Sequence, residues 1–395
     1  METLTEKLNK SERTALRLSD YIKIKHGFAF KGEYFSLSPT SDILVTPGNF
    51  AIGGGFKSDK FKYYKGHVPD DYILKADDLV VTMTDLSVDA DTLGYSALIP
   101  KDSNNRYLHN QRVGLVQKLQ DGISLNFLYY LMRTRQYQKY VVSTASGSTV
   151  KHTSPDRIAS YEYEFPAVSL QEKIAQVLIV YDVKIENNNS IIKKLEVAAQ
   201  TQFDEWFVNF RFPGYENTKF VDSEMGEIPE GWEIKSVLDV IERISPGKKY
   251  DNKSASPSGA VPVLDQGASG FIGYHNDEPG VVASIDKPVV VFTNHTCYYR
   301  ILTEPFSCIQ NVLPYVGKNG YDTFFVYFLT KEKIKMSEYK GHWPEFEQQV
   351  FAIPTPELAN KFSKLAKVFI EKIVSCEKEN ILLKSQRDRL LAKLI

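Results

Sequence analysis

A long internal repeat constrains the fold of this chain more than any other feature. From Leu170 to Ala199, apolar or small residues recur at steps of three and four, the spacing of one buried stripe along a helix. A second stripe runs from Leu358 to Leu383. The register that places Leu170 on Leu358 also places Leu195 on Leu383, and we call it the repeat register. The repeat therefore predicts two long amphipathic helices at equivalent places in two half-chains.

The length of the stripes indicates what the two helices pack against. Residues 170–206 would form a helix about 55 Å long at 1.5 Å per residue. A stripe of this length needs a partner, and we expect the two helices to pair with each other as a coiled coil. The alternative is that each helix packs on its own domain, and the asparagine run 187–189, which interrupts the first stripe, keeps this alternative open.

A mixed region precedes each helix. The first contains strand-like runs at Asp78–Thr82 and Val113–Gln117, and the second contains them at Pro288–Thr293 and Tyr298–Leu302, with glycine and proline at the turns. These patterns predict an α+β fold. The predicted segments are a first globular domain at 1–165, a first long helix at 166–211, a connector at 212–231, a second globular domain at 232–353 and a second long helix at 354–395.

Cysteine usage and hydropathy indicate the compartment. Cys297, Cys308 and Cys376 form neither a CxxC pair nor an even set for disulfides, which favours a reducing environment. The segment from Met1 to Ser19 has no apolar h-region, and no apolar run reaches the roughly 20 residues that a membrane helix needs. We therefore expect a cytoplasmic protein of two or three domains.

The net charge of −1 hides regional differences. Residues 1–160 and 351–395 each carry a net charge of +4, whereas residues 161–225 carry −5 and residues 226–350 carry −4. No block resembles a basic tail. Any affinity for nucleic acid must therefore come from local patches, with partner subunits supplying part of the phosphate neutralisation.

Motifs that carry catalytic chemistry are missing from the sequence. The seven histidines lack metal-ligand spacing, no GxxxxGK[ST] or GxSxG motif occurs, and Gly53–Gly55 does not fit GxGxxG. A base-flipping adenine methyltransferase would need a glycine-rich cofactor loop and an Asn/Asp-Pro-Pro-aromatic segment, and neither is present. The acid-x-Lys triplets at Asp251 and Glu338 lack the preceding Pro-Asp of a metal-dependent nuclease. We predict no catalytic residue, metal or cofactor in this chain.

Basic residues interleaved with aromatics recur in both globular regions, and they are typical of nucleic-acid contacts. Lys and Arg neutralise phosphates, while Asn, Thr and His can bind base edges. Alternating lysine and aromatic residues are equally typical of a half-buried edge strand. Two polar loops at matched positions, Ser146–Ser154 and Tyr339–Pro344, favour a shared role facing DNA. The candidate DNA-binding residues are Lys25, His26, Lys31, Lys62, Lys65, Ser148, Thr149, Lys151, His152, Lys248, Lys249, Asn294, His295, Arg300, Lys340 and His342.

An ordered set of short motifs resembles the specificity subunit of type I restriction–modification systems. The motifs follow the order of that family along nearly the whole chain, although the second half departs more, with Gly341–Pro344 in place of Ser146–Thr149. They are Leu18–Ile22, Gly27–Gly32, Ser146–Thr149, Phe165–Ala175, Ile228–Trp232 and Ile353–Leu358.

The resemblance implies two target-recognition domains, separated by two long antiparallel coiled-coil helices, that bind the two halves of a bipartite, asymmetric sequence in double-stranded DNA. The helices would fix the gap between the half-sites and dock two modification subunits. Those subunits would use S-adenosylmethionine, and motor–nuclease subunits would use ATP and Mg. The implied partner-binding residues are Leu170, Ile174, Val177, Leu358, Phe362 and Leu365.

Three other functions remain open from the sequence. One is a single-chain methyltransferase–endonuclease with a DNA-binding region, which the missing catalytic motifs disfavour. Another is a coiled-coil scaffold that binds no DNA, from which salt-dependent binding to duplex DNA would distinguish the chain. The third is a stand-alone transcriptional regulator, disfavoured because no compact helix-turn-helix is evident.

Overall fold

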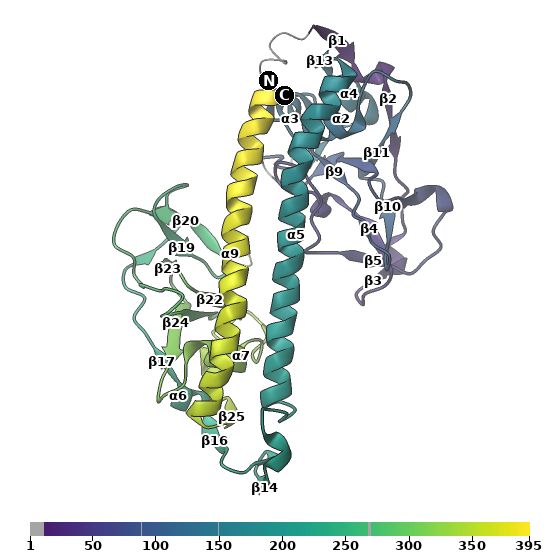
Figure 1. Ribbon diagram of the computed structural model, residues 1–395. Coiled ribbons are helices and arrows are strands. Elements are labelled where there is room, and N and C mark those ends of the chain that lie inside the picture. Colours follow the sequence, from purple (N-terminus) through teal and green to yellow (C-terminus); the bar gives the residue numbers. More distant parts are fainter. Residues whose placement is uncertain (1–11, 88, 149, 268–269) are drawn as a thin grey trace. The chain divides into compact units, whose positions relative to one another are not determined.

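The computed structural model describes residues 12–87, 89–148, 150–267 and 270–395 (Figure 1). Contacts divide the chain into two compact units, the first comprising residues up to Glu186 with Ile381–Ile395, and the second comprising Asn187–Asn380. The two long helices, α5 (Val168–Phe207) and α9 (Pro356–Leu394), therefore contribute residues to both units. The boundary between the units falls inside both helices. None of the helices in the described ranges is long and apolar enough to cross a membrane.

Unit 1 contains two principal sheets. The first is antiparallel, in the order β2 (Ile22–His26), β11 (Val113–Lys118), β7 (Leu79–Thr82) and β9 (Ser96–Leu98). The second has the order β3 (Phe35–Ser36), β5 (Lys62–Tyr64), β4 (Asp42–Val45), β10 (Arg106–His109) and β6 (Ile73–Leu74), with β4 and β10 parallel. Shorter elements complete the unit: β1 (Arg13–Arg17) paired with β13 (Glu162–Pro166), β8 (Thr84–Asp85) paired with β12 (Lys151–His152), α2 (Leu125–Leu131), α3 (Arg135–Ser143) and α4 (Pro155–Ala159).

Unit 2 repeats this plan. Its antiparallel sheet has the order β17 (Ile241–Arg243), β24 (Val312–Gly317), β21 (Val289–Thr293) and β22 (Tyr299–Leu302). A second sheet has the order β18 (Lys249–Tyr250), β23 (Ser307–Ile309), β19 (Val261–Leu264) and β20 (Phe271–His275), with β19 and β23 parallel. The other elements are the hairpin β14 (Phe220–Ser223) and β15 (Gly226–Pro229), β16 (Glu233–Ser236) paired with β25 (Val350–Ile353), α6 (Val237–Val240), α7 (Thr323–Thr330) and α8 (Trp343–Glu347).

The antiparallel sheets of the two units have the same strand order, so the repeat covers the globular regions as well as the helices. Within each antiparallel sheet, the strand that comes first in the chain lies beside the strand that comes last, followed by the second and the third. A flanking pair, β1–β13 or β16–β25, leads into the long helix of each unit. The predicted α+β fold with two pseudo-repeated regions is confirmed.

The two long helices pair antiparallel within each unit (Figure 1). In unit 1, the start of α5 packs against the end of α9, with Ile174 and Leu178 in one core with Leu391 and Leu394. In unit 2, the end of α5 packs against the start of α9 in the same way. Both cores also contain residues of the globular region, so each helix packs on its own unit and on the other helix. The predicted coiled-coil pairing is confirmed.

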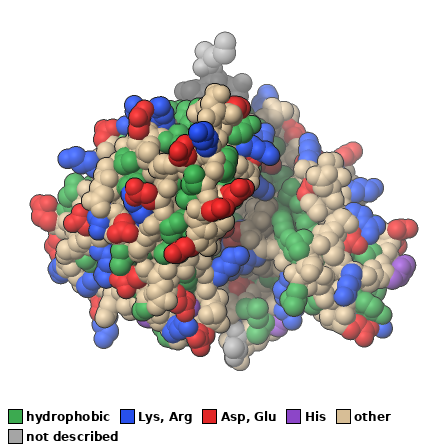
Figure 2. Space-filling model, turned by 90° about the horizontal axis from the view of Figure 1, so that it is seen from below, with side chains coloured by type: hydrophobic (Ala, Val, Ile, Leu, Met, Phe, Trp, Pro, Cys, Tyr) green, Lys and Arg blue, Asp and Glu red, His purple; other side chains and the backbone are tan. Residues whose placement is uncertain are grey.

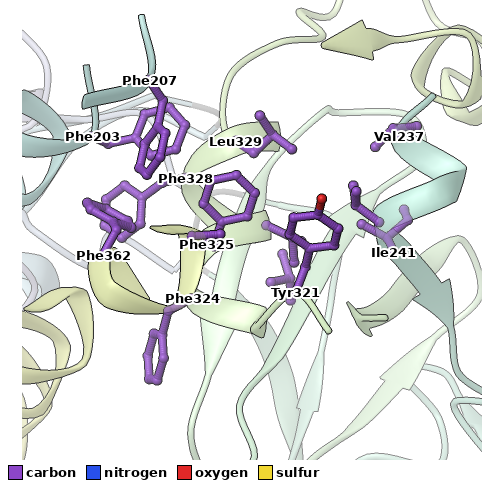
Figure 3. Close-up of a cluster of buried hydrophobic side chains, with 14 of the residues drawn as sticks. Phe203, Phe207, Val237, Ile241, Tyr321, Phe324, Phe325, Phe328, Leu329 and Phe362 are labelled. Atoms are coloured by element: carbon purple, nitrogen blue, oxygen red, sulfur yellow. The ribbon is translucent and has the colours of Figure 1, made fainter. Parts of the chain in front are cut away.

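An aromatic cluster forms the centre of the unit 2 core (Figure 3). Phe362 of α9 lies with its ring centroid 5.5 Å from that of Phe203 and 5.4 Å from that of Phe207, both on α5. Phe328 of α7 stacks on Phe203 at 6.1 Å and meets Phe362 edge-on at 5.4 Å. Offset and edge-to-face contacts of this kind add about 1 kcal/mol each beyond the area they bury. The cluster joins the globular region of unit 2 to both helices.

A partly buried ion-pair network joins the same three parts in unit 1. Asp182 of α5 accepts hydrogen bonds from Nη1 of Arg133 at 2.8 Å and from the hydroxyl of Tyr130 at 2.9 Å. Its other oxygen accepts a hydrogen bond from Arg387 of α9. Burial opposes ionisation of Asp182, but the charges of Arg133 and Arg387 and their hydrogen bonds outweigh it, so the pKa of this carboxyl is lowered.

The asparagine run in α5 forms a polar layer inside the helix pair of unit 2. Asn188 and Asn380 are each only 6% exposed. The amide of Asn188 donates to Oδ1 of Asn380 at 3.0 Å and to Glu379 at 2.9 Å, and Asn380 donates to Asn189 at 2.9 Å. The run therefore does not end the pairing, because its amides satisfy one another across the two helices.

Asp182→Asn should lower the free energy of unfolding at pH 7 by about 3 kcal/mol, the usual cost of breaking a buried ion pair. The folded pKa of Asp182 lies below its usual value of 3.8. The stabilisation by the carboxylate is therefore present above the unfolded pKa and is lost as pH falls through the folded pKa. In urea titrations, the difference between wild type and variant should be constant above about pH 5 and should shrink below about pH 4.

The exposed Glu186 of the same helix offers a matched control, and Glu186→Gln should change the free energy of unfolding little at any pH. A difference for Asp182→Asn that persists unchanged in strong acid would contradict the assigned role of the carboxylate.

Candidate nucleic-acid interface

The loop at Ser146–His152 in unit 1 is closed by its own backbone. The amide of Ser146 donates to the carbonyl of His152 at 2.9 Å, and the amide of His152 donates back to Ser146 at 2.8 Å. Gly147 has φ +95°, and a Cβ there would lie 2.0 Å from the carbonyl oxygen of Val150. Only glycine fits this turn. Ser148 is exposed, whereas Thr149 lies outside the described residues.

This loop packs along the end of the central strand β7. Lys151 pairs with Asp85 and His152 with Thr84, and the side chains of His152 and Thr84 meet at 3.1 Å from Nδ1 to Oγ1. The next residue, Thr153, donates its amide to the carbonyl of Met83 at 3.0 Å. Lys151 is partly buried and His152 is exposed, so a histidine ring lies at the surface of this edge.

The structure adds a cavity beside this edge that the sequence did not indicate. It measures about 500 Å³ and is lined by residues of two loops, among them Pro47, Phe50 and Lys57 of the first and Asp85, Ser87 and Thr92 of the second, with Ile52 and Leu86 exposed at its rim. Asp85 lies within it. Burial raises the pKa of Asp85, but hydrogen bonds from Thr92 and Ser87 outweigh burial and lower it. No local motif signals this cavity, because its walls come from two segments that are well separated along the chain.

The unit 1 lysines lie on and around β5. Lys31, Lys62 and Lys65 are exposed, and β5 lies between β3 and β4 within its sheet. The alternation of lysine and aromatic residues at Lys62–Lys65 is therefore not explained by an edge strand that lysines protect. Lys57 and Lys60 lie in the preceding segment, so the surface around β5 carries several cations, of which Lys57 pairs with Asp59 at 3.2 Å and Lys31 with Glu33 at 3.9 Å.

Lys25 and His26 lie together on β2. The Lys25 ammonium donates to the carbonyl of Asp71 at 2.7 Å and lies 4.6 Å from the ring centroid of Tyr72, which holds it against the protein. His26 is exposed. The nearby His109 is buried and its pKa is lowered to about 4 by burial, so it is neutral at physiological pH.

In unit 2 the structure brings two predicted segments together at the equivalent strand end. Asn294, which follows β21, accepts hydrogen bonds from the amides of His342 and Trp343, each at 2.8 Å. The residues that follow β21 and the segment 339–344 therefore form one site. In unit 1, Ser146–His152 and the end of β7 form the equivalent site. Asn294 itself is held by backbone and is not free to bind a base edge through Oδ1.

Two polar groups of this site keep unused hydrogen-bonding capacity. Nδ1 of His295 and Nη1 of Arg300 are buried without a hydrogen-bond partner among the described residues. Arg300 donates through Nη2 to the carbonyl of Gly267, and burial lowers the pKa of its guanidinium. Buried donors of this kind are costly unless a ligand or water satisfies them, which favours His295 and Arg300 as ligand-contacting residues.

Lys340 and His342, two further unit 2 candidates, lie beside carboxylates. Lys340 lies 2.8 Å from Glu338 and 2.7 Å from Glu345, and these carboxylates raise the pKa of its ammonium. His342 is fully buried, with Nδ1 2.9 Å from Glu345 and Nε2 3.1 Å from the carbonyl of Glu338. His342 is therefore a structural residue here, and its proposed contact with DNA is not supported by this conformation.

Lys248 and Lys249 precede the stacked pair Tyr250 and His275. Lys248 is exposed and bonds to Asp277 at 2.9 Å, which raises the pKa of Lys248 and lowers that of Asp277. Lys249 is exposed as well. Figure 2 shows Lys and Arg side chains interspersed with Asp and Glu over one face rather than gathered into a single patch.

The predicted partner-binding residues fall into two groups. Leu170 (8% exposed), Ile174 (0%) and Phe362 (0%) are buried in the cores, and Leu358 is packed against one. Burial in the chain's own core leaves these four residues unavailable to a partner. Val177 (38% exposed) and Leu365 (43%) face outward, at positions related by the repeat. Only this pair remains suited to a partner.

Comparisons with known proteins agree with this architecture. Residues 16–197 match the sequence model of the type I restriction modification DNA specificity domain. The type I restriction enzyme MjaIX specificity subunit of Methanocaldococcus jannaschii is 26% identical over 300 residues, which cover 70% of this chain and 69% of that protein. The putative MjaX specificity subunit of the same organism is 27% identical over 277 residues, covering 64% of this chain and 62% of that protein.

A solved structure shares the fold. The crystal structure of the type I restriction-modification system S subunit from M. genitalium aligns over 98% of this chain and 97% of its own, with a TM-score of 0.57 and 16% identity. The shared fold is a repeated α+β unit packed on two paired helices. The matched domain and the similar relatives support a protein of the HsdS family of type I restriction–modification specificity subunits.

Replacing Lys62 and Lys65 with alanine should weaken binding to every duplex about equally, because phosphate contacts carry no sequence information. With the assembled modification complex, the slope of log K against log salt should fall by about 2, since each phosphate contact contributes about 0.9.

The matched control is Lys101→Ala, which removes an exposed lysine of the same unit that pairs with Asp77 at 3.3 Å. An unchanged slope for the double variant, or a loss confined to the recognised sequence, would contradict the assignment of Lys62 and Lys65 to phosphate binding.

Proposed function

We propose that the chain binds a bipartite, asymmetric DNA sequence, each unit contacting one half-site. The observation that carries this proposal is the equivalent site at the end of the central strand in both units. In unit 1 Thr153 bonds to Met83, and in unit 2 His342 bonds to Asn294. A duplicated unit with the same strand order supplies two similar DNA-facing surfaces in one chain.

The two surfaces differ in chemistry, which favours two different half-sites. The unit 1 loop presents His152 and Lys151 beside Thr84 and Asp85. The unit 2 segment holds Lys340 between two carboxylates and leaves His295 and Arg300 as the residues with unused donor or acceptor capacity. Different donor and acceptor groups at equivalent places select different bases.

We propose that the chain itself catalyses no reaction. S-adenosylmethionine would bind to modification subunits that methylate adenine, and ATP and Mg would bind to motor–nuclease subunits. No group of three His, Cys, Asp or Glu side chains able to hold a metal ion occurs within the described ranges. Methyl transfer by the purified chain alone would instead favour a single-chain methyltransferase–endonuclease.

A repeated surface stripe on the long helices is the proposed docking site for the modification subunits. On α5 the stripe consists of Lys173, Val177, Val180 and Lys184, spaced so that all four lie on one helix face. Val180 is 63% exposed, although it is aliphatic. The stripe offers a partner an apolar centre with a lysine at each end.

The same stripe recurs on α9 in the repeat register. It consists of Lys361, Leu365, Val368 and Lys372, and Val368 is 62% exposed. The first stripe belongs to unit 1 and the second to unit 2. Two matching stripes fit two copies of one partner, whose complementary surface would be apolar with acidic flanks.

Aspartate substitutions at the centre of each stripe should remove one modification subunit each. A buried, unpaired charge costs several kcal/mol, so Val180→Asp or Val368→Asp should leave one bound subunit and the double variant none. Native mass spectrometry of the co-purified complex measures the stoichiometry.

The control is Ile381→Asp on α9. Ile381 is 70% exposed and aliphatic, but its repeat-related position is Lys193, so it does not belong to a repeated stripe, and this variant should keep both subunits. Two bound subunits on a folded Val180→Asp, Val368→Asp chain would overturn the proposed docking site.

We further propose that the paired helices fix the gap between the half-sites. Matched insertions of seven residues after Asn189 in α5 and after Lys378 in α9 preserve the stripe period and add about 10.5 Å to each helix. The gap in the methylated sequence should lengthen by about three base pairs, at about 3.4 Å per base pair. An unchanged gap would contradict the spacer role.

A further inference from the structure

The ionic layer of the helix pair has no counterpart in the other half of the repeat. Asp182 of α5 and Arg387 of α9 meet inside unit 1, with exposed side-chain fractions of 23% and 13%. The repeat register relates Asp182 to Ile370 and Arg387 to Ala199. Ile370 and Ala199 are both buried in the unit 2 core, at 6% and 0% exposed. One half of the pair thus has a partly buried ion pair where the other has buried apolar residues.

The asparagine layer breaks the repeat in the same manner. Asn188 of α5 bonds to Asn380 of α9 at 3.0 Å. Their repeat-related positions are Cys376 and Ile192, which are apolar or weakly polar. Both polar layers therefore join residues of α5 to residues of α9 that have no equivalent on the other helix.

The remaining layers keep the same character in both halves. The repeat register relates apolar residues to apolar residues at Ile185 and Ile373, Leu195 and Leu383, Phe203 and Leu391, and Trp206 and Leu394. As far as these layers are concerned, α5 could pair with α5 of a second copy of the chain, or α9 with a second α9. Apolar packing tolerates such swaps when volume is roughly conserved.

The polar layers penalise both of these alternatives. If α5 paired with a second α5, Asp182 would face Ala199 and Asn188 would face Ile192. If α9 paired with a second α9, Arg387 would face Ile370 and Asn380 would face Cys376. In each case a buried charge and a buried amide would lose the partner on the opposite helix, which is costly inside a packed interface.

We propose that the Asp182–Arg387 and Asn188–Asn380 layers are specificity determinants that restrict pairing to one α5 with one α9 and exclude α5–α5 and α9–α9 pairing with a second copy of this chain. A single buried asparagine is known to set register and partner choice in coiled coils, and charge pairs act alike. The pairing choice does not depend on DNA binding.

This restriction has a consequence that rests on the proposed function. A molecule built from one α5 and one α9 always contains one unit 1 and one unit 2. Pairing of α5 with α5 would instead bring two copies of unit 1 onto one helix pair, and such an assembly would bind a symmetric sequence. The polar layers would thereby keep the recognised sequence asymmetric.

The test compares the full chain with a symmetrised chain, in which each polar residue of the two layers is replaced by an apolar residue like the one at its repeat-related position. The four substitutions are Asp182→Ile, Arg387→Ala, Asn188→Ala and Asn380→Ile. A reporter cysteine, Ser190→Cys, is added to both. Ser190 is exposed and lies near the point where α5 would meet itself in an α5–α5 pair, because Asn188 would there face Ile192. The native Cys297, Cys308 and Cys376 are buried.

Each protein is unfolded in urea, refolded under reducing conditions without DNA, and treated with a short bismaleimide. A denaturing gel then measures the covalently linked two-chain species. The wild-type layers should give only the background found without Ser190→Cys, and the symmetrised chain should give at least a tenfold higher yield, since about 1.4 kcal/mol corresponds to a factor of ten.

Equal yields from the two folded proteins, or a high yield from the wild-type layers, would overturn the proposal. Variants with only one symmetrised layer, Asp182→Ile with Arg387→Ala or Asn188→Ala with Asn380→Ile, keep the test decisive if the fourfold variant does not fold, and each should raise the yield above background.

The matched control is Glu186→Ala with Lys384→Ala, which removes one negative and one positive charge from exposed positions of the same helices and should leave the yield at background. The assay contains no DNA, so its outcome is independent of the half-site proposal.

Discussion

The antiparallel contact between α5 and α9 is the constraint on which the rest of the structure depends. In unit 1 the core that includes Leu18 and Phe127 is completed by Ile174 of α5 and Leu394 of α9. The unit 2 core is completed in the same way by Phe203 and Phe362. Because these two cores take residues from both helices, each globular region buries part of its apolar surface against the helix pair.

Polar contacts then fix the globular region of unit 1 to that pair. Arg133, only 5% exposed, reaches from the turn after α2 to Asp182 of α5 and also donates through Nε to the carbonyl of Gly53 at 3.0 Å. A Cβ at Gly54 would lie 2.4 Å from Cγ of Arg133, which explains a glycine at that position. The loop beside the cavity is therefore connected to the helix through one guanidinium, and in the proposed function a DNA-facing loop is held by the element that docks partners.

The sequence predicted the helices and the repeat well because helical periodicity is a local property. The buried stripe follows the period of a helix, and the repeat register was readable without knowing the fold. Strand pairing was not predictable, since parallel β4–β10 and β19–β23 contacts join distant segments. The asparagine run looked like an interruption because a single stripe does not show the partner amide of Asn380 that satisfies it.

Residue-level predictions fared unevenly for the same reason. His342 lies in a polar segment, yet the fold buries it between two groups of its own turn. Among the apolar helix residues, periodicity could not separate Ile174, which is buried, from Val177, which is exposed, because the apolar stripe is wider than the contact face. The cavity beside Phe50 and Asp85 had no local signal at all.

Methylome sequencing of cells that carry this chain with its modification subunits tests the central claim most directly, when the globular region of one unit is exchanged for that of a relative. The account predicts one split adenine motif in which only the half contacted by the exchanged unit changes, while the gap and the other half stay the same. A motif that changes in both halves, or an unsplit motif, would contradict it.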